Sequence, residues 1–107
     1  MPLLDMKDLL KKAKKEKYGV GAFSIANMEM IMGTIKAAEE LNSPIILQIA
    51  EVRLNYSPLY LIGPMMIEAA KKAKVPVAVH LDHGMTLEVI KEALELGFTS
   101  VMIDGSQ

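Results

Sequence analysis

The sequence contains no cysteine among its 107 residues. It therefore has neither disulfides nor thiolate metal ligands, and a bound metal ion would depend on histidine and carboxylate side chains. No apolar run approaches the ~18 residues that a membrane span requires, and the opening residues lack the basic and apolar segments of a secretion signal. These absences lead us to expect a cytoplasmic protein without a membrane partner.

The sequence also lacks an excess of charge of either sign, since it contains 12 basic and 13 acidic residues. No net field would attract nucleic acid, so we expect no nucleic-acid partner. We interpret the one dense charge cluster as the solvated face of an amphipathic helix. This cluster consists of Lys11, Lys12, Lys14, Lys15 and Lys17.

Several nucleotide-binding and nucleophile patterns are missing as well. Neither a GxGxxG loop nor a GxxxxGK loop is present, which disfavours dinucleotide and nucleoside triphosphate chemistry. No lysine lies in or just after the predicted strands, so this part of the chain offers no Schiff-base nucleophile.

What the sequence does contain is a regular alternation of helical stripes with short apolar runs. The predicted helices cover 3–17, 28–41, 58–73 and 87–96, and the predicted strands cover 18–25, 45–50, 75–81 and 99–103. The strands are nearly continuous apolar runs, which is typical of parallel strands buried on both faces. We also expect the nine methionines to lie mostly at core positions of the helices.

Local end signals mark these helices. Asn27 and Thr86 are predicted N-caps, and Gly97 is predicted to end the last helix. Ser57 before Pro58 predicts the start of the third helix, although Gly63–Pro64 favours a later start. The buried stripe predicted for the second helix is Met28, Ile31, Met32, Ile35 and Ala38.

Buried strands that alternate with amphipathic helices indicate parallel βα units with right-handed crossovers. Such units build either open doubly wound sheets or closed eightfold barrels, and the pattern does not separate the two. A complete eightfold barrel needs about 250 residues, so four strands amount to half of one. In both architectures the functional residues follow the carboxyl ends of the strands.

The third predicted strand ends in an unusual polar run. His80, Asp82 and His83 follow an apolar segment, and packing gives a buried strand no reason to end in such groups. His80 and Asp82 point to one side of the strand, and a turn permitted by Gly84 would bring His83 round to them. We interpret Asp82 and His83 as a site for metal-assisted proton transfer, and His80 as a hydrogen-bonded structural group.

Polar residues also follow the other three strands. Asp104, followed by Gly105 and Ser106, is a second candidate site residue, with an ordinary turn as the alternative. The first strand ends at Ser24, and the second ends at Ala50 with Glu51 after it. We expect these strand ends to meet at one edge of the sheet.

These residues resemble the class II fructose-bisphosphate and tagatose-bisphosphate aldolase family. The resemblance is carried by VPVAVHLDHG at 75–84 and by GFTSVMIDGS at 97–106. Shorter segments at 1–3, 18–23, 27–29 and 43–48 resemble the same family, so that nearly the whole chain is covered.

The resemblance implies a TIM barrel of which residues 1–107 form the N-terminal half of one domain. It further implies Zn²⁺ or another divalent cation, and reversible cleavage of a ketose bisphosphate into dihydroxyacetone phosphate and an aldehyde phosphate. Asp82 matches the family's acid/base and His83 matches one of its metal ligands. Asp104 corresponds to a carboxylate near the metal, with a role at a secondary cation position, where a monovalent cation is also a candidate.

The sequence departs from the family pattern in four places. Ser24 stands where the family usually has Asn, and Ala50 where it often has Ser, and both positions belong to the substrate pocket. Residues 51–56 differ from the usual glycine-rich loop, and Gln107 replaces a common His. These departures leave the choice of phosphosugar open.

The family's other two metal-binding His, its phosphate-binding loops and a further Glu come from the second half of the barrel. Because a catalytic zinc needs three protein ligands, we expect residues 1–107 alone to be inactive. We expect the complete enzyme to be a homo-oligomer. Two alternatives remain, namely a noncatalytic half-barrel that associates with itself and a diverged phosphosugar-binding barrel enzyme.

Overall fold

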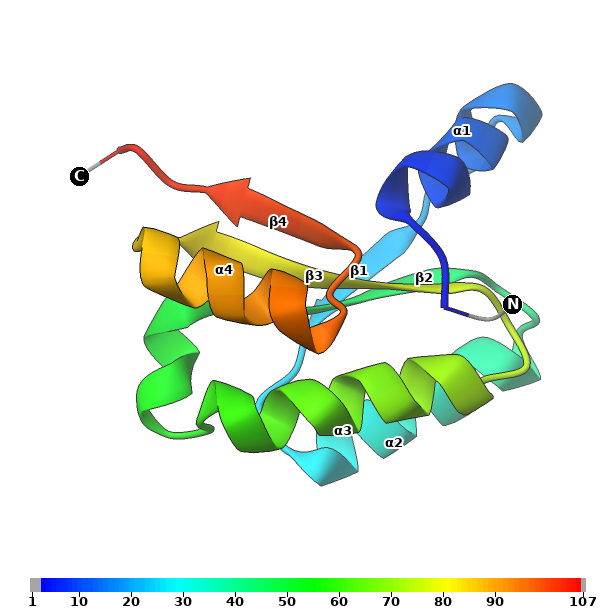
Figure 1. Ribbon diagram of the computed structural model, residues 1–107. Coiled ribbons are helices and arrows are strands. Elements are labelled where there is room, and N and C mark those ends of the chain that lie inside the picture. Colours follow the sequence, from blue (N-terminus) through cyan, green and yellow to red (C-terminus); the bar gives the residue numbers. More distant parts are fainter. Residues whose placement is uncertain (1–2, 107) are drawn as a thin grey trace.

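The computed structural model describes residues 3–106, which fold around a sheet of four parallel strands (Figure 1). The strands are β1 (Gly21–Ser24), β2 (Ile45–Ala50), β3 (Val77–Gly84) and β4 (Ser100–Ile103). The helices are α1 (Met6–Glu16), α2 (Met28–Glu40), α3 (Leu59–Lys72) and α4 (Leu87–Leu96), with a short 3₁₀ helix η1 (Glu51–Asn55). The strand order β1-β2-β3-β4 follows the chain, so the predicted succession of parallel βα units is confirmed.

Alternate side chains of the strands enter two separate cores. Leu47 and Val79 belong to the main core together with buried residues of α2, α3 and α4. Ile46 and Ala78 point the other way and pack with Leu9 of α1. Figure 1 shows α1 across the sheet from α2 and α3. The strands β2 and β3 are therefore covered on both faces near their amino ends, as their continuous apolar sequence requires.

Three of the predicted helix ends are confirmed. Asn27 caps α2 by accepting a hydrogen bond from the Met30 backbone at 2.8 Å, and Thr86 caps α4 by accepting one from the Val89 backbone at 3.3 Å. Gly97 follows α4 with φ of 104°, a left-handed conformation that glycine adopts without steric cost.

The start predicted for α3 is only partly right. The helix begins at Leu59 and contains both Gly63 and Pro64, so these two residues do not delay it. Ser57 does not cap it, because its hydroxyl donates instead to the carbonyl oxygen of Ala26 in the loop after β1. The residues between β2 and α3 form η1, which the sequence pattern does not predict.

The burial predicted for β1 and for the methionines is wrong in the described range. All four residues of β1 are exposed, because β1 lies at the edge of the sheet and pairs only with β2. Met28 and Met32 are 49% and 61% exposed, and α2 buries only Ile31 and Ala38. Met30, Met85 and Met102 are also exposed.

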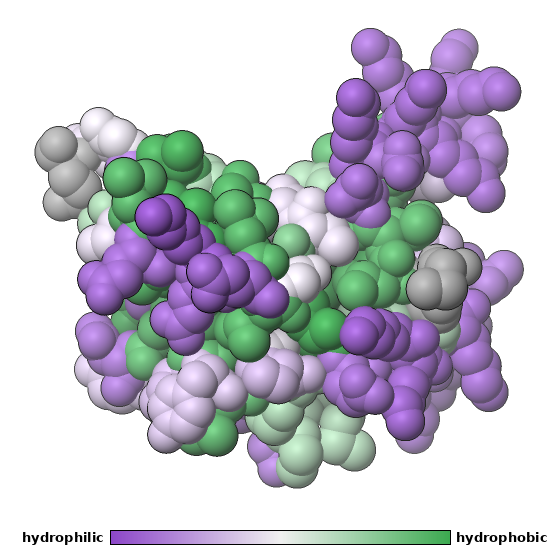
Figure 2. Space-filling view, in the orientation of Figure 1, coloured by the Kyte–Doolittle hydropathy of each residue, from purple (hydrophilic) through white to green (hydrophobic). Residues whose placement is uncertain are grey.

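Helix α1 carries the lysine cluster, and its charged residues are exposed as predicted. Figure 2 shows them as a hydrophilic projection beside a more apolar surface. No helix within residues 3–106 combines the length and apolar character that crossing a membrane requires.

Because Gly97 has a left-handed backbone conformation, a side chain at this position should destabilise the end of α4. We expect Gly97→Ala to lower the free energy of unfolding by about 1–2 kcal/mol, because an L-residue pays that cost at positive φ. Gly33→Ala is the matched control, since Gly33 lies inside α2 with open space around its Cα, and should gain about 0.5–1 kcal/mol. Denaturant unfolding of both variants measures this, and equal effects of the same sign would contradict it.

Candidate active site

A row of polar side chains crosses the sheet on the face that carries α1. Neighbouring residues of a parallel ladder point to the same side, and four polar residues are aligned by the strand register. They are Ser24, Gln48, His80 and Ser100. One step nearer the carboxyl ends, Ala50 is the ladder partner of Asp82. The strand register therefore brings two predicted pocket positions, Ser24 and Ala50, to the same region as Asp82.

Asp82 is held from its β2 side by an amide. Gln48 Nε2 donates to Asp82 Oδ2 at 3.4 Å and to Ser24 Oγ at 3.0 Å, so one amide links three strands. The Asp82 side chain is 20% exposed and thus remains open to a small molecule. Gln48 was not predicted as a site residue, although its position as the one polar residue in the run Ile45–Ala50 is a usable signal.

His83 lies beside Asp82, as predicted, with its Nε2 atom 3.7 Å from Asp82 Oδ2. The turn that achieves this is at His83 itself, where φ is 48°, and not at Gly84. Gly84 serves a different purpose. A Cβ atom there would lie 2.9 Å from Ile90 Cγ1 and 2.9 Å from the Met102 carbonyl oxygen, so close packing excludes a side chain.

Asp104 fixes the orientation of the His83 ring. Its Oδ2 atom lies 3.0 Å from His83 Nδ1, and its Oδ1 atom accepts bonds from the Ser106 hydroxyl at 2.6 Å and the Ser106 backbone at 2.9 Å. The Ser106 hydroxyl and backbone donors, followed by His83, lower the Asp104 pKa from 3.8 to about 2. An ionised carboxylate only accepts, so in a neutral His83 ring Nδ1 carries the proton and Nε2 keeps its lone pair.

His80 behaves as the structural group that the sequence predicts. Its Nδ1 atom lies 2.8 Å from the Ser100 hydroxyl, and its Nε2 atom lies 3.6 Å from Asp82 Oδ1. Burial lowers the pKa of His80 below its ordinary value, and the nearby Asp82 opposes this effect. A neutral His80 in this position buttresses the Asp82 carboxylate from the side opposite Gln48.

The donor set fits a single ligand of a divalent metal site. Metal-binding histidines usually donate a hydrogen bond from their second ring nitrogen to a carboxylate or another acceptor. This hydrogen bond fixes the tautomer and the orientation of the ring. Within residues 3–106, however, no group of three or more His, Asp or Glu side chains is placed to hold a metal ion. His83 would therefore be one of several ligands, and Asp104 is already engaged in orienting it.

A cavity of about 480 Å³ lies between β1 and α2, where Phe23 and Leu41 line it, and it includes none of the predicted site residues. Gln107, which departs from the family pattern, lies outside the described residues.

Four parallel strands with their helices, which carry a carboxylate and an imidazole at the carboxyl ends, form an α/β arrangement of the (β/α)₈-barrel family. The comparisons with known proteins identify the family. The chain belongs to the family "Fructose-bisphosphate aldolase class-II", whose model matches residues 4–107.

Individual relatives agree with this assignment. The fructose-bisphosphate aldolase of Giardia intestinalis is 48% identical, over 99% of this chain and 33% of its own length. The 6-phospho-5-dehydro-2-deoxy-D-gluconate aldolase of Halalkalibacterium halodurans is 41% identical, over 99% of this chain and 38% of its own. The crystal structure of the YdjI aldolase from Escherichia coli K12 superposes with a TM-score of 0.91 at 36% identity, over 97% of this chain and 40% of that one. The chain thus spans little more than a third of the length of these relatives.

The environment of His80 leads to a prediction about its protonation. Because burial outweighs the attraction of Asp82, the imidazole should titrate below 6.5, the ordinary value of its pKa. Nitrogen-15 NMR of the imidazole rings, recorded as the pH is lowered, measures this directly. A titration midpoint of His80 at or above pH 6.5 would show that the attraction of Asp82, and not burial, determines the pKa.

Proposed function

We propose that this chain forms the N-terminal half of the barrel of a divalent-metal-dependent ketose-bisphosphate aldolase. The observation that carries the proposal is the placement of the Asp82 carboxylate 3.7 Å from a histidine nitrogen whose tautomer Asp104 fixes. The proposed reaction is the reversible cleavage of fructose or tagatose bisphosphate into dihydroxyacetone phosphate and glyceraldehyde 3-phosphate.

Asp82 is proposed to move the proton. In the cleavage direction its carboxylate takes the proton of the hydroxyl next to the bond that breaks. The hydroxyl carbon becomes the aldehyde, and the electron pair of the carbon–carbon bond stays with the ketone fragment, which later gains a proton. Gln48 and His80 flank Asp82 and hold it in place during this exchange.

His83 is proposed to bind the metal through Nε2. A bound Zn²⁺ or similar cation would polarise the ketone and stabilise the negative charge that develops on its oxygen. The remaining ligands and the phosphate-binding groups are proposed to come from residues outside 1–107, in the same cytoplasmic, homo-oligomeric enzyme. An accompanying monovalent cation near Asp104 belongs to the same proposal.

Ser24 and Ala50 are the two predicted pocket positions that bear on the choice of substrate. The Ser24 hydroxyl is bonded to Gln48, and the Ala50 side chain beside Asp82 has no polar group to offer a substrate. The relative from Halalkalibacterium halodurans is named for a phosphorylated sugar acid and not for a ketose bisphosphate, which supports a second candidate, a diverged phosphosugar aldolase. Substrate screening on the full-length protein separates the two candidates.

Replacing the proton-transfer group tests the mechanism. We expect Asp82→Asn in the full-length protein to lower the rate of cleavage by about 10²–10⁴-fold, the usual contribution of a general base. Asp8→Asn, which removes an exposed carboxylate from α1, is the control and should leave the rate unchanged. A coupled assay of triose phosphate release gives both rates, and full activity of Asp82→Asn would exclude the proposed role.

The isolated segment should behave differently from the full-length enzyme. We expect residues 1–107 alone to bind Zn²⁺ weakly and to show no turnover, since His83 is one ligand where three are needed. Metal titration and the same coupled assay measure this, after intact mass has verified the product. EDTA-sensitive cleavage by the 107-residue chain would contradict the expectation, and light scattering tests whether the chain associates with itself.

A further inference from the structure

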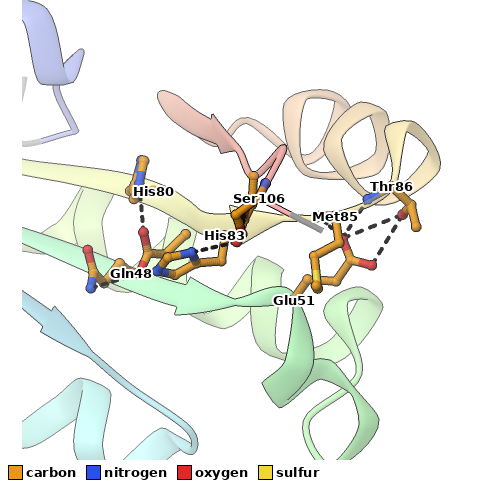
Figure 3. Close-up of polar contacts among 9 residues, drawn as sticks. Gln48, Glu51, His80, His83, Met85, Thr86 and Ser106 are labelled. Atoms are coloured by element: carbon orange, nitrogen blue, oxygen red, sulfur yellow. Dashed lines mark hydrogen bonds and ion pairs between the residues drawn. The ribbon is translucent and has the colours of Figure 1, made fainter.

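Glu51 connects two loops at the carboxyl edge of the sheet. It is the first residue of η1, directly after β2, and its side chain reaches the loop between β3 and α4. Its Oε1 atom accepts hydrogen bonds from the backbone N–H groups of Met85 at 2.7 Å and Thr86 at 3.1 Å. Its Oε2 atom lies 3.3 Å from the Thr86 hydroxyl. Figure 3 shows Glu51 pointing at this pair of residues.

The contact between Glu51 and Thr86 completes the N-terminal cap of α4, for which the local sequence supplies only one of the two hydrogen bonds. In a capping box, the N-cap side chain bonds the third helical residue, and a Glu at that position bonds back to the N-cap N–H. Thr86 does the first by accepting from Val89, but Val89 has no side-chain acceptor to return the bond. Glu51 provides the missing half from a different loop, and its negative charge lies favourably at the helix N-terminus.

The segment that Glu51 holds begins two residues after His83. His83 has φ of 48°, a left-handed conformation that is unfavourable for an L-residue and persists only where neighbours impose it. On one side, Asp104 holds the ring of His83, and the Asp104 backbone donates to the Gly84 carbonyl oxygen at 2.9 Å. On the other side, Glu51 holds the backbone of Met85 and Thr86. The strained turn is thus held at His83 itself and again in the three residues that follow it.

We propose that Glu51 is a positioning residue that keeps the His83 turn in the conformation that presents Nε2 beside Asp82. This inference rests on the proposed function, in which Nε2 binds the metal. It implies that the loop after β2 influences metal affinity without touching the metal. A glutamate whose only task is to cap α4 would stabilise the helix and leave metal affinity unchanged.

The experiment uses three variants of the full-length protein. Glu51→Ala removes the acceptor, and Glu51→Gln keeps an amide oxygen that can accept the same two N–H bonds without the charge. Glu88→Ala is the matched control, because Glu88 is an exposed carboxylate in the first turn of the same helix. Amide hydrogen exchange of the segment 84–90 and titration of the metal-free protein with Zn²⁺ or Co²⁺ are measured for each.

We expect Glu51→Ala to speed exchange at Met85 and Thr86 roughly tenfold, as loss of a cap does. We expect the same variant to weaken metal affinity by about 10–100-fold, the usual effect of removing a group that orients a ligand. Glu51→Gln should recover most of that affinity, and Glu88→Ala should leave it unchanged.

Faster exchange with unchanged metal affinity in Glu51→Ala would overturn the positioning role and leave Glu51 as a helix cap. Equal losses of affinity in Glu51→Ala and Glu88→Ala would also overturn it, since the helix N-terminal charge would then be the cause. If the unsubstituted protein bound no metal, the proposed function would fail. Unchanged exchange at Met85 and Thr86 would then separately reject the contact with Glu51.

Discussion

The hydrogen bond between Asp104 Oδ2 and His83 Nδ1 is the interaction on which the site depends. It joins the ends of β3 and β4, and it determines which nitrogen of His83 carries the proton. Ser106 holds the other oxygen of Asp104 and, with His83, keeps the carboxylate ionised. With Nδ1 protonated, Nε2 is left as an acceptor beside Asp82. In the proposed function, this imidazole nitrogen would bind a cation and the neighbouring carboxylate would transfer a proton.

The sheet makes this arrangement possible through its register. The parallel ladder aligns Ser24, Gln48 and His80 on one face, where a hydrogen-bonded row leads to Asp82. The opposite face is apolar and packs against three helices, so the strands cannot rotate to bury the polar row. Side chains that are far apart in the sequence therefore meet because packing of the other face fixes the direction in which they point. The loops then refine the geometry, with Glu51 holding one end of the His83 turn.

Much of the fold could be predicted from the sequence. The features that could not be predicted depend on contacts between residues that are far apart in the sequence. The strand β2 and the caps Asn27, Thr86 and Gly97 follow from apolar runs and local end signals, which act over a few residues. The turn at His83 could not be predicted, because a left-handed φ at a non-glycine residue results from contacts with Asp104, 21 residues away in sequence. Glu51 acts at a still greater separation of 34 residues. Burial of Met28 and Met32 was predicted wrongly because periodicity marks an apolar face without showing what covers it.

The most direct test of the central claim is the tautomer of His83 in the metal-free full-length protein. Nitrogen-15 NMR distinguishes a ring protonated at Nδ1 from one protonated at Nε2 through the chemical shifts of the two nitrogens. The hydrogen bond to Asp104 predicts a proton on Nδ1 and a free Nε2 at neutral pH, and loss of this preference in Asp104→Ala. A neutral ring protonated at Nε2 in the unsubstituted protein would contradict the account, because the nitrogen beside Asp82 could then not accept a metal ion.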